Sequence, residues 1–143
     1  MSLPDERFAM KVRTVVTGVG ALTPLGNSVN DLWSGLLSGR SGIGRVTRFN
    51  VDDYPTQIAG ELKGFEPSTV IEKKELRRMD LAQQYSIVAS EMAVKDAGLV
   101  LASLDLDRCG VVIGSGIGGI TTFEQQHSTL VTSGPGRVSP FFI

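Results

Sequence analysis

The glycines of one short segment have a spacing that could bind a nucleotide. Gly114, Gly116 and Gly119 satisfy G-x-G-x-x-G between an apolar run and a candidate helix. Such a turn can hold a dinucleotide pyrophosphate at a helix N-terminus, and the ribose then needs an acidic residue about 20 positions further on. Residues 133–139 contain no acidic residue. We therefore expect a steric purpose for these glycines, which permit sharp turns and close approach of the backbone.

A second candidate for chemistry is the pair formed by the one thiol and the one imidazole of the chain, Cys109 and His127. They could form an activated nucleophile only if the fold brought them together with an orienting group. Cys109 begins a predicted buried strand, where a small apolar residue is ordinary. His127 lies in a polar helical stretch. We assign neither a catalytic role, and with no ligand cluster in the sequence we expect no metal.

The third candidate is basic. Lys74, Arg77 and Arg78 have i, i+3 and i+4 spacing, so they share one face of a predicted helix. Cations near a helix start oppose the helix dipole, and the acidic neighbours leave this face net positive. Two interpretations stay open. The face is either simply solvated or it binds an acidic macromolecule.

The elements that must position these groups follow from the apolar periodicity and the turn residues. The pattern predicts helices at residues 29–37, 74–97 and 121–132, and strands at residues 11–17, 56–62 and 109–113. Ser28 is expected to cap the first helix, and Gly39 and Gly98 to end the first two. The last strand is almost wholly apolar, which is typical of burial on both faces. The alternation predicts an α/β fold with a mainly parallel sheet.

Length and composition limit the class of protein. A chain of 143 residues that is 41% apolar, with mean hydropathy +0.09, can form one domain with a core. Fourteen basic and fifteen acidic residues give a net charge of −1, which favours no nucleic acid. No apolar run approaches the ~18 residues of a membrane span. One cysteine excludes an internal disulfide and indicates a reducing compartment, so we expect a cytoplasmic protein. Residues 1–10 are expected to be disordered or added in cloning, with Met1 and Met10 as alternative starts.

Five segments together resemble the β-ketoacyl-acyl-carrier-protein synthases of fatty-acid synthesis, most closely those of type II. They match in register and in order over nearly all of residues 12–143. The segments are V-V-T-G-V-G-A-L-T-P-L-G-N-S (15–28), W-S-G-L-L-S-G-R-S-G-I (33–43), K-K-E-L-R-R-M-D (73–80), V-V-I-G-S-G-I-G-G (111–119) and R-V-S-P-F-F-I (137–143).

The resemblance implies the thiolase-like fold, in which two similar halves stack as αβαβα layers in a homodimer. Residues 11–143 would be the N-terminal portion of the first half. The family joins an acyl thioester to malonyl-carrier protein with loss of CO₂ and needs no cofactor. Its nucleophilic cysteine, two histidines and lysine match positions beyond Ile143. No catalytic residue is therefore expected in this chain, which should be inactive by itself.

The resemblance also implies binding roles. Ile117 matches a residue that lines the acyl tunnel, and Phe142 one that reaches the partner's tunnel across the dimer interface. Four cations match positions that dock the acidic acyl carrier protein: Lys74, Arg77, Arg78 and Arg137. Gly136 departs from the pattern, since relatives often carry a further cation there.

Three other interpretations remain. A chain-length factor keeps the family's fold as a non-catalytic partner subunit, and the residue at the downstream cysteine position would decide this. A polyketide-type ketosynthase shares the motifs, although the match over residues 111–143 is closer to type II. A small nucleotide-binding α/β domain is suggested by the glycine turn and opposed by the missing acidic residue.

Overall fold

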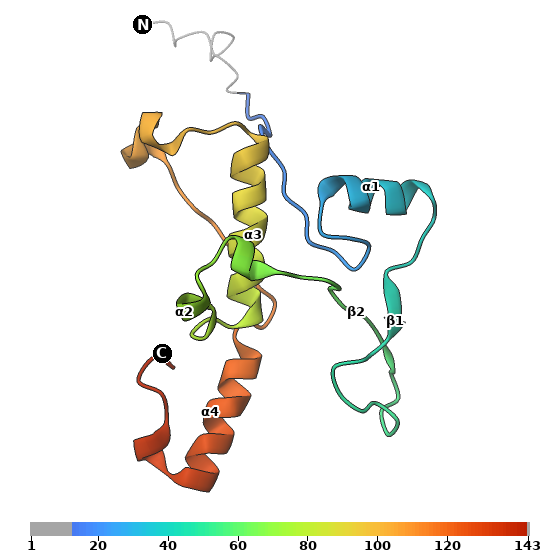
Figure 1. The fold of residues 1–143 in the computed structure, drawn as a ribbon, viewed down its shortest axis with the longest axis vertical. Coiled ribbons are helices and arrows are strands. Elements are labelled where there is room, and N and C mark those ends of the chain that lie inside the picture. The colour runs from blue at the N-terminus through green and yellow to red at the C-terminus, as the bar shows by residue number, and fades with distance from the viewer. Residues whose placement is uncertain (1–12, 143) are drawn as a thin grey trace, which may run out of the picture.

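A computed structural model of the chain describes residues 13–142. The predicted tail at residues 1–10 and the first two positions of the predicted strand 11–17 lie outside this range. Figure 1 shows α3 at the centre, α4 below it, and α1 with the β1–β2 hairpin to one side. In chain order the described elements are α1 (Val29–Leu37), β1 (Ile43–Arg45), β2 (Ile58–Gly60), η2 (Pro67–Thr69), α2 (Lys73–Leu76), α3 (Leu81–Asp96), η3 (Leu101–Ser103), η4 (Leu106–Arg108), α4 (Ile120–Ser133) and η5 (Pro135–Arg137), the η elements being 3₁₀ turns.

Local sequence signals set the ends of α1. The Ser28 hydroxyl accepts a hydrogen bond from the Asp31 amide at 3.0 Å and donates one to the Asp31 carboxylate at 2.7 Å. These bonds satisfy a first-turn donor that has no partner within the helix. Gly39 follows the helix with φ of 64°, which glycine adopts without strain. The predicted helix 29–37 is confirmed, and α4 likewise confirms the prediction of a helix over 121–132.

The prediction of a single helix over residues 74–97 is wrong, because the helix is interrupted between α2 and α3. Asp80 is the N-cap of α3 and accepts from the Ala82 amide at 3.3 Å. The Asp80 amide in turn donates to the Gln83 side chain at 2.9 Å, which completes a capping box. A new helix therefore starts at Leu81, and Gly98 follows its end with φ of 62°.

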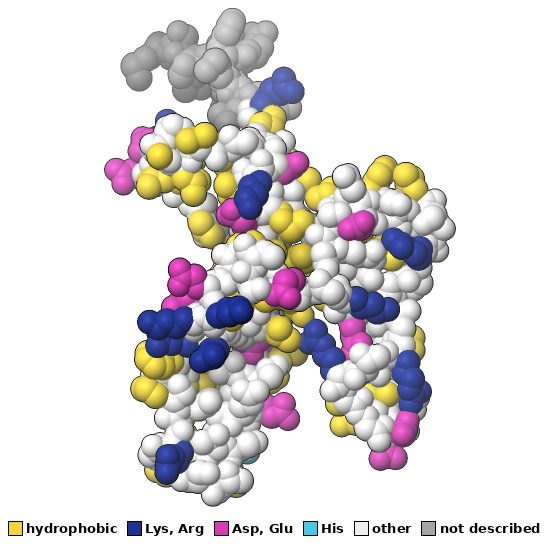
Figure 2. All heavy atoms as spheres, viewed as in Figure 1, with side chains coloured by type: hydrophobic (Ala, Val, Ile, Leu, Met, Phe, Trp, Pro, Cys, Tyr) yellow, Lys and Arg dark blue, Asp and Glu magenta, His cyan; other side chains and the backbone are white. Residues whose placement is uncertain are grey.

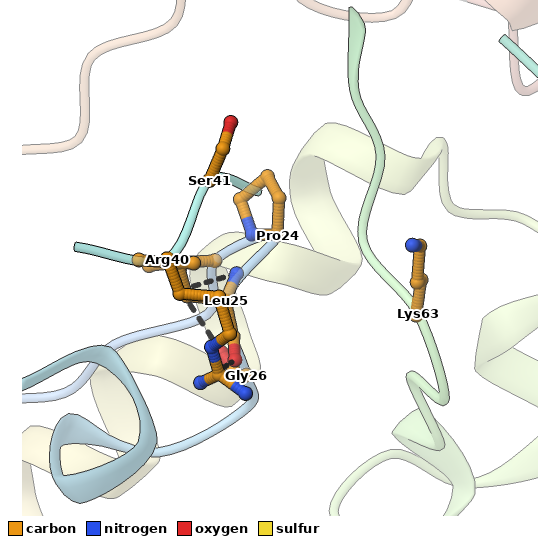
Figure 3. Close-up of a pocket in the computed structure, with 7 residues that line it drawn as sticks. Pro24, Leu25, Gly26, Arg40, Ser41 and Lys63 are labelled. Atoms are coloured by element: carbon orange, nitrogen blue, oxygen red, sulfur yellow. Dashed lines mark hydrogen bonds between the residues drawn. The ribbon is translucent and has the colours of Figure 1, made fainter. Parts of the chain in front are cut away.

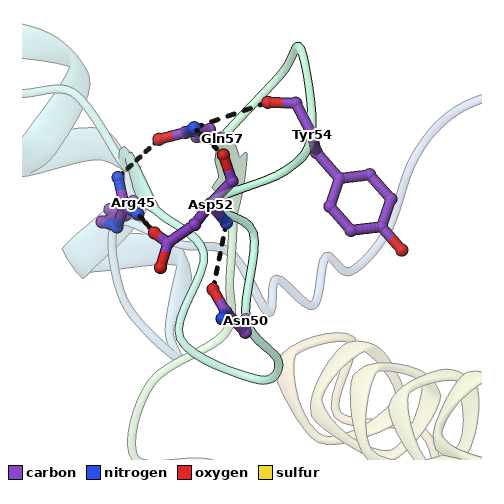
Figure 4. Close-up of polar contacts among 5 residues, drawn as sticks. All are labelled: Arg45, Asn50, Asp52, Tyr54 and Gln57. Carbon is purple, nitrogen blue, oxygen red and sulfur yellow. Dashed lines mark hydrogen bonds and ion pairs between the residues drawn. The ribbon is translucent and has the colours of Figure 1, made fainter.

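The strand predicted at 56–62 is confirmed over β2. It pairs with β1 in an antiparallel hairpin in which Ile43 lies opposite Gly60. The sequence pattern predicts no element between residues 38 and 55, but β1 lies there. Figure 4 shows the polar contacts that support this hairpin: Arg45 forms an ion pair with Asp52 and donates to the Gln57 side chain at 2.6 Å.

The mainly parallel sheet is not present within residues 13–142, whose one sheet is the β1–β2 hairpin. The strands predicted at 11–17 and 109–113 are therefore wrong over the described positions. A strand exists only when a neighbour supplies its ladder hydrogen bonds, and neither segment has one here. Val16 is 82% exposed. Val112 is 96% exposed, so the burial on both faces expected of residues 109–113 is absent as well.

The N-terminal segment packs closely on α3, beside which it runs in Figure 1. A Cβ atom added at Gly18 would collide with the Ala93 carbonyl, and one added at Gly20 with the Ala89 carbonyl. The Val19 amide also donates to the Asp96 carboxylate at 2.9 Å. The absence of side chains at Gly18 and Gly20 therefore allows the backbone to lie directly against α3. The buried apolar side chains among the described residues are those of Val51, Ile71 and Val88. No helix of the described part has the length and apolarity needed to cross a bilayer.

Candidate functional site

The predicted basic residues lie at the junction of α2 and α3. Lys74 belongs to α2, and Arg77 and Arg78 occupy the turn that follows. All three are exposed, and the ion pairs found within residues 13–142 do not include them. Figure 2 shows Lys and Arg side chains gathered over this part of the surface. We call these three residues the basic turn; their charge is available to a partner.

A pocket of about 220 Å³ lies beside the basic turn. It is lined both by residues next to the basic turn and by residues near the end of the chain. The Arg78 guanidinium lies 4.7 Å from the centre of the Phe141 ring, a cation–π contact. Arg77, Asp80, Thr122 and Phe142 also line this pocket. The fold therefore brings residues 77–80 next to residues 141–142, which are more than sixty positions away in the sequence.

A larger and mainly apolar pocket of about 650 Å³ adjoins the first and shares Arg78, Asp80 and Phe142 with it. Its walls also include Ile87 from α3, with Ile113, Gly118 and Gly119 from the glycine turn. An apolar recess beside cations suits a ligand that combines an apolar part with a negative charge.

The two predicted acyl-binding residues have different places. Phe142 is half-buried and lines both pockets, and its ring centre lies 5.9 Å from that of Phe123. Ile117 is 81% exposed and lines neither. It adjoins Gly118, which does line the larger pocket. The structure therefore brings Phe142, but not Ile117, to these walls.

Arg137 is separated from the basic turn. It ends η5, which follows α4, while α4 begins beside Asp80. A helix of 14 residues is about 21 Å long. The four predicted docking cations therefore form two groups, with Arg137 at the far end of α4. Both groups are exposed.

Asp80 is a site residue that the sequence analysis missed. Its carboxylate accepts from the amide and from the hydroxyl of Thr122, both at 3.0 Å. Burial raises the pKa of Asp80, but the hydrogen bonds from Thr122, Ala82 and Leu81 outweigh this effect, so its pKa lies below the ordinary value. The pattern Asp80-x-x-Gln83 was the available signal, since it is typical of a helix start. No sequence signal pointed to the bond with Thr122.

The glycine turn matches its predicted purpose only in part. Gly118 has φ of 71°, which favours glycine, whereas a Cβ at Gly114 or Gly116 would meet no atom within 4 Å in the described part of the chain. A nucleotide phosphate would need the N-terminus of α4. The Asp80 carboxylate occupies that N-terminus through its bonds to Thr122, which counts against the nucleotide-binding interpretation.

Cys109 and His127 are both exposed. The Cys109 thiol contacts the Asp105 carbonyl at 3.3 Å, and no hydrogen bond joins it to His127. The predicted burial of Cys109 is wrong, because the strand that would have buried it does not form. No group of residues suited to hold a metal ion occurs in the part of the chain that is described.

A third pocket, of about 290 Å³, lies at the turn before α1 and is shown in Figure 3. The Arg40 guanidinium donates to the Leu25 carbonyl at 3.2 Å and so holds the turn against the end of α1. Lys63 also lines this pocket, but Figure 3 shows its side chain directed away from Arg40. The pocket therefore has a structural explanation, with Arg40 closing a turn.

Solved structures with the same fold define the class of this chain. A type II polyketide ketosynthase, solved in complex with its acyl-carrier protein, matches 89% of this chain and 34% of its own length at 30% identity, with a TM-score of 0.73. The ishigamide ketosynthase/chain length factor matches 90% of this chain and 32% of its own length at 30% identity, with a TM-score of 0.71. The chain therefore has the thiolase-like fold of ketosynthases, as the family resemblance implied.

The family follows from the sequence match. Residues 11–143 match the family model described as the N-terminal domain of beta-ketoacyl synthase, and the chain belongs to that family. It is 50% identical over 136 residues to 3-oxoacyl-[acyl-carrier-protein] synthase 2 of Staphylococcus aureus (strain MRSA252), which covers 95% of this chain and 33% of that protein. It is 46% identical over 133 residues to the enzyme of that name from Synechocystis, covering 93% of this chain and 32% of that protein. The chain thus spans about a third of the length of these relatives.

Proposed function

We propose that this chain is the N-terminal part of a 3-oxoacyl-[acyl-carrier-protein] synthase of fatty-acid synthesis. The complete protein would form a carbon–carbon bond between an acyl thioester and malonyl-carrier protein, with loss of CO₂. The observation that carries the proposal is the identity of 50% to a curated synthase of this kind over 95% of the chain. Identity to the polyketide ketosynthase is 30%, which favours fatty-acid over polyketide synthesis.

In this reaction the acyl group is first held as a thioester on the enzyme's cysteine, which we expect at a position beyond this segment. Malonyl-carrier protein then loses CO₂, and the resulting carbanion attacks the acyl carbonyl carbon. The new C–C bond forms as the C–S bond to the cysteine breaks, and the 3-oxoacyl product remains on the carrier. None of these bond changes is assigned to a residue of this chain.

The proposed role of this segment is recognition. The exposed cations Lys74, Arg77 and Arg78, with Arg137 at the other end of α4, would attract and orient the acidic carrier protein. Charges at such a rim mainly raise the rate of encounter and select the partner. Phe142 would contribute to the apolar wall for the acyl chain, and Ile117, which lies outside that wall in the single chain, would join it only in the complete protein. The position of the basic turn beside the apolar pocket supports these two roles, carrier binding by the cations and acyl-chain binding by the apolar wall.

We further propose that the complete protein works as a cytoplasmic homodimer. Phe142 would then reach the partner's acyl tunnel, as the resemblance implies. In the single chain its ring packs beside Phe123 instead. Size measurement by light scattering, together with cross-complementation of a Phe142→Ala protomer by a catalytically inactive one, would test this arrangement.

The direct test of the proposed function uses the complete protein that contains this segment. It is incubated with carrier protein that bears an acyl group and with carrier protein that bears a malonyl group, and the products are identified by mass spectrometry. The expected product is a 3-oxoacyl-carrier protein two carbons longer than the starting acyl chain, formed with one CO₂ per turnover. Absence of both condensation and decarboxylation would reject the proposal.

A chain-length factor is the second candidate, and the match to a ketosynthase/chain length factor structure favours considering it. Such a subunit would lack condensing activity alone and gain a role only beside a catalytic partner. The same assay distinguishes the two candidates, because a synthase is active without an added ketosynthase subunit. The residue found at the expected cysteine position provides an independent answer.

A further inference from the structure

The helix α4 has no capping side chain of its own. Its N-cap residue is Gly119, and no side chain near in sequence accepts from its first amides. The Asp80 carboxylate supplies this acceptor from 42 positions away, through the Thr122 amide and hydroxyl. Thr122 is the third residue of α4, one of the two positions whose amide an N-cap normally accepts from. We call the bonds from Thr122 to Asp80 the Asp80 bridge.

The same carboxylate caps α3 through the Ala82 amide. One negative charge therefore lies at the N-termini of two helices, where it is favourable for both. The bridge ties the start of α3 to the start of α4, and so fixes two connecting segments relative to each other. One is the turn that carries Arg77 and Arg78, and the other contains Gly118 and Gly119.

These two segments are the ones that a carrier-borne substrate would need together. Arg77 and Arg78 lie three and two positions before Asp80 and line the smaller pocket. Gly118 and Gly119 immediately precede α4 and line the larger one. Asp80 lines both pockets, and so lies where the cations meet the apolar recess.

We infer that Asp80 is a positioning residue, whose bridge to Thr122 holds the basic turn at a fixed place beside the apolar pocket, so that a carrier protein bound to the cations presents its acyl chain there. This inference rests on the proposed function. It concerns only substrates attached to the carrier, because a small free thioester does not use the cations. A displacement of about 1 Å in such a positioned contact can cost about a hundredfold in rate.

A purely electrostatic role predicts the opposite result. Asp80 is an anion beside cations that would bind an acidic partner. If its charge were all that mattered, Asp80→Asn would strengthen binding of the carrier. If the bridge matters, the same change weakens use of the carrier, since the amide cannot replace the charged acceptor at full strength.

The test compares two substrates in the complete protein: an acyl group on the carrier and the same acyl group on pantetheine. Asp80→Asn is expected to lower kcat/KM for the carrier-borne substrate about tenfold, the effect of weakening one charged hydrogen bond, while the small thioester changes less than about threefold. Thr122→Val, which removes only the hydroxyl bond, should give an intermediate loss. If the Asp80→Asn protein does not fold, Thr122→Val alone still tests the inference. Thr132→Val is the control, because its hydroxyl bonds only to Ser128 and Ser133, both within α4.

Each outcome has one meaning. A selective loss on the carrier-borne substrate supports the inference. An equal loss on both substrates, no change in either, or improved use of the carrier overturns it while the proposed function stands. If the unsubstituted protein turns over neither substrate, the proposed function is wrong and this inference falls with it.

Discussion

Two neighbouring arginines of the basic turn carry the same charge but make different contacts. Arg78 stacks on Phe141, whereas Arg77 is exposed and makes no ion pair within residues 13–142. Arg77 therefore offers the cleaner test of charge. Arg78 contributes to local packing as well, and a planar guanidinium is not replaced by a lysine ammonium in such a stack.

Reversal of the charge at Arg77 should weaken recognition of an acidic carrier. We expect Arg77→Glu in the complete protein to raise KM for carrier-borne substrate about fivefold at low salt, with kcat little changed, as is typical for an exposed rim charge. Steady-state kinetics at two salt concentrations measures this, and the difference should shrink at high salt because of screening. Arg108→Glu, an exposed reversal in η4, is the matched control. Equal effects of the two changes would contradict a specific docking role for Arg77.

The lowered pKa of Asp80 predicts a dependence of stability on pH. Folding favours the ionised carboxylate, so its contribution is present above the ordinary pKa of about 3.9 and is lost as the pH falls through the lower folded value. We expect unfolding of the complete protein in urea to show an advantage over Asp80→Asn of about 1 kcal/mol or less, as the group is partly exposed. That advantage should be constant from pH 7 to about pH 5 and shrink below about pH 4. Parallel stability curves for the two proteins down to pH 3 would exclude the charged bridge.

At the scale of elements, the packing of the N-terminal segment on α3 depends on glycine. The Ala89 carbonyl occupies the space that a Cβ at Gly20 would need. We expect Gly20→Ala to reduce the free energy of unfolding of the complete protein by about 1–3 kcal/mol, the usual cost of overpacking. Gly44→Ala is the control, since a Cβ there meets no described atom within 4 Å and its φ is not positive. Thermal melting of both variants measures the difference. A Gly20→Ala protein as stable as the control would show that the segment does not lie against α3.

The elements that could be predicted from the sequence are those with local causes. Ser28 and Gly39 bound α1 by contacts within a few residues, and such signals can be read directly. The break at Asp80 was also readable, from its relation to Gln83, but the apolar periodicity across residues 74–97 concealed it. The strands at 11–17 and 109–113 depend on partners distant in sequence or absent from the described residues. No local pattern can supply a ladder partner.

In the candidate site, too, the sequence could predict which residues take part but not the contacts between distant segments. The resemblance to known motifs selected Arg77, Arg78 and Phe142, and the structure brings these three to one pocket. The cation–π contact of Arg78 and the bond from Thr122 to Asp80 join segments more than forty positions apart. Their residue types carry no sign of such pairing. Ile117 was selected by the same motifs, yet it lies 81% exposed outside the pocket walls.

At the scale of the whole molecule, many more large apolar side chains are exposed than are buried among the described residues. The exposed ones include the consecutive pairs Val15–Val16 and Val111–Val112, which have no ladder partner within residues 13–142. Extended apolar segments with free backbone groups are the usual sites of association between chains. The relatives are about three times as long as this chain. In those relatives further polypeptide follows the matched region, and the equivalent polypeptide in the complete protein could cover these valines.

The 143 residues expressed alone should associate through these uncovered valines. With these valines uncovered, we expect the chain to bind a dye for apolar surfaces and to form aggregates in size-exclusion chromatography with light scattering. It should catalyse neither condensation nor decarboxylation of malonyl-carrier protein. Co-expression with the remaining part of the complete protein should yield a soluble complex, because new strands can then pair with residues 13–17 and 109–113. A monodisperse monomer that melts cooperatively and binds no dye would contradict this account of the exposed valine segments. Decarboxylation by the isolated chain would contradict the assignment of catalysis to other residues.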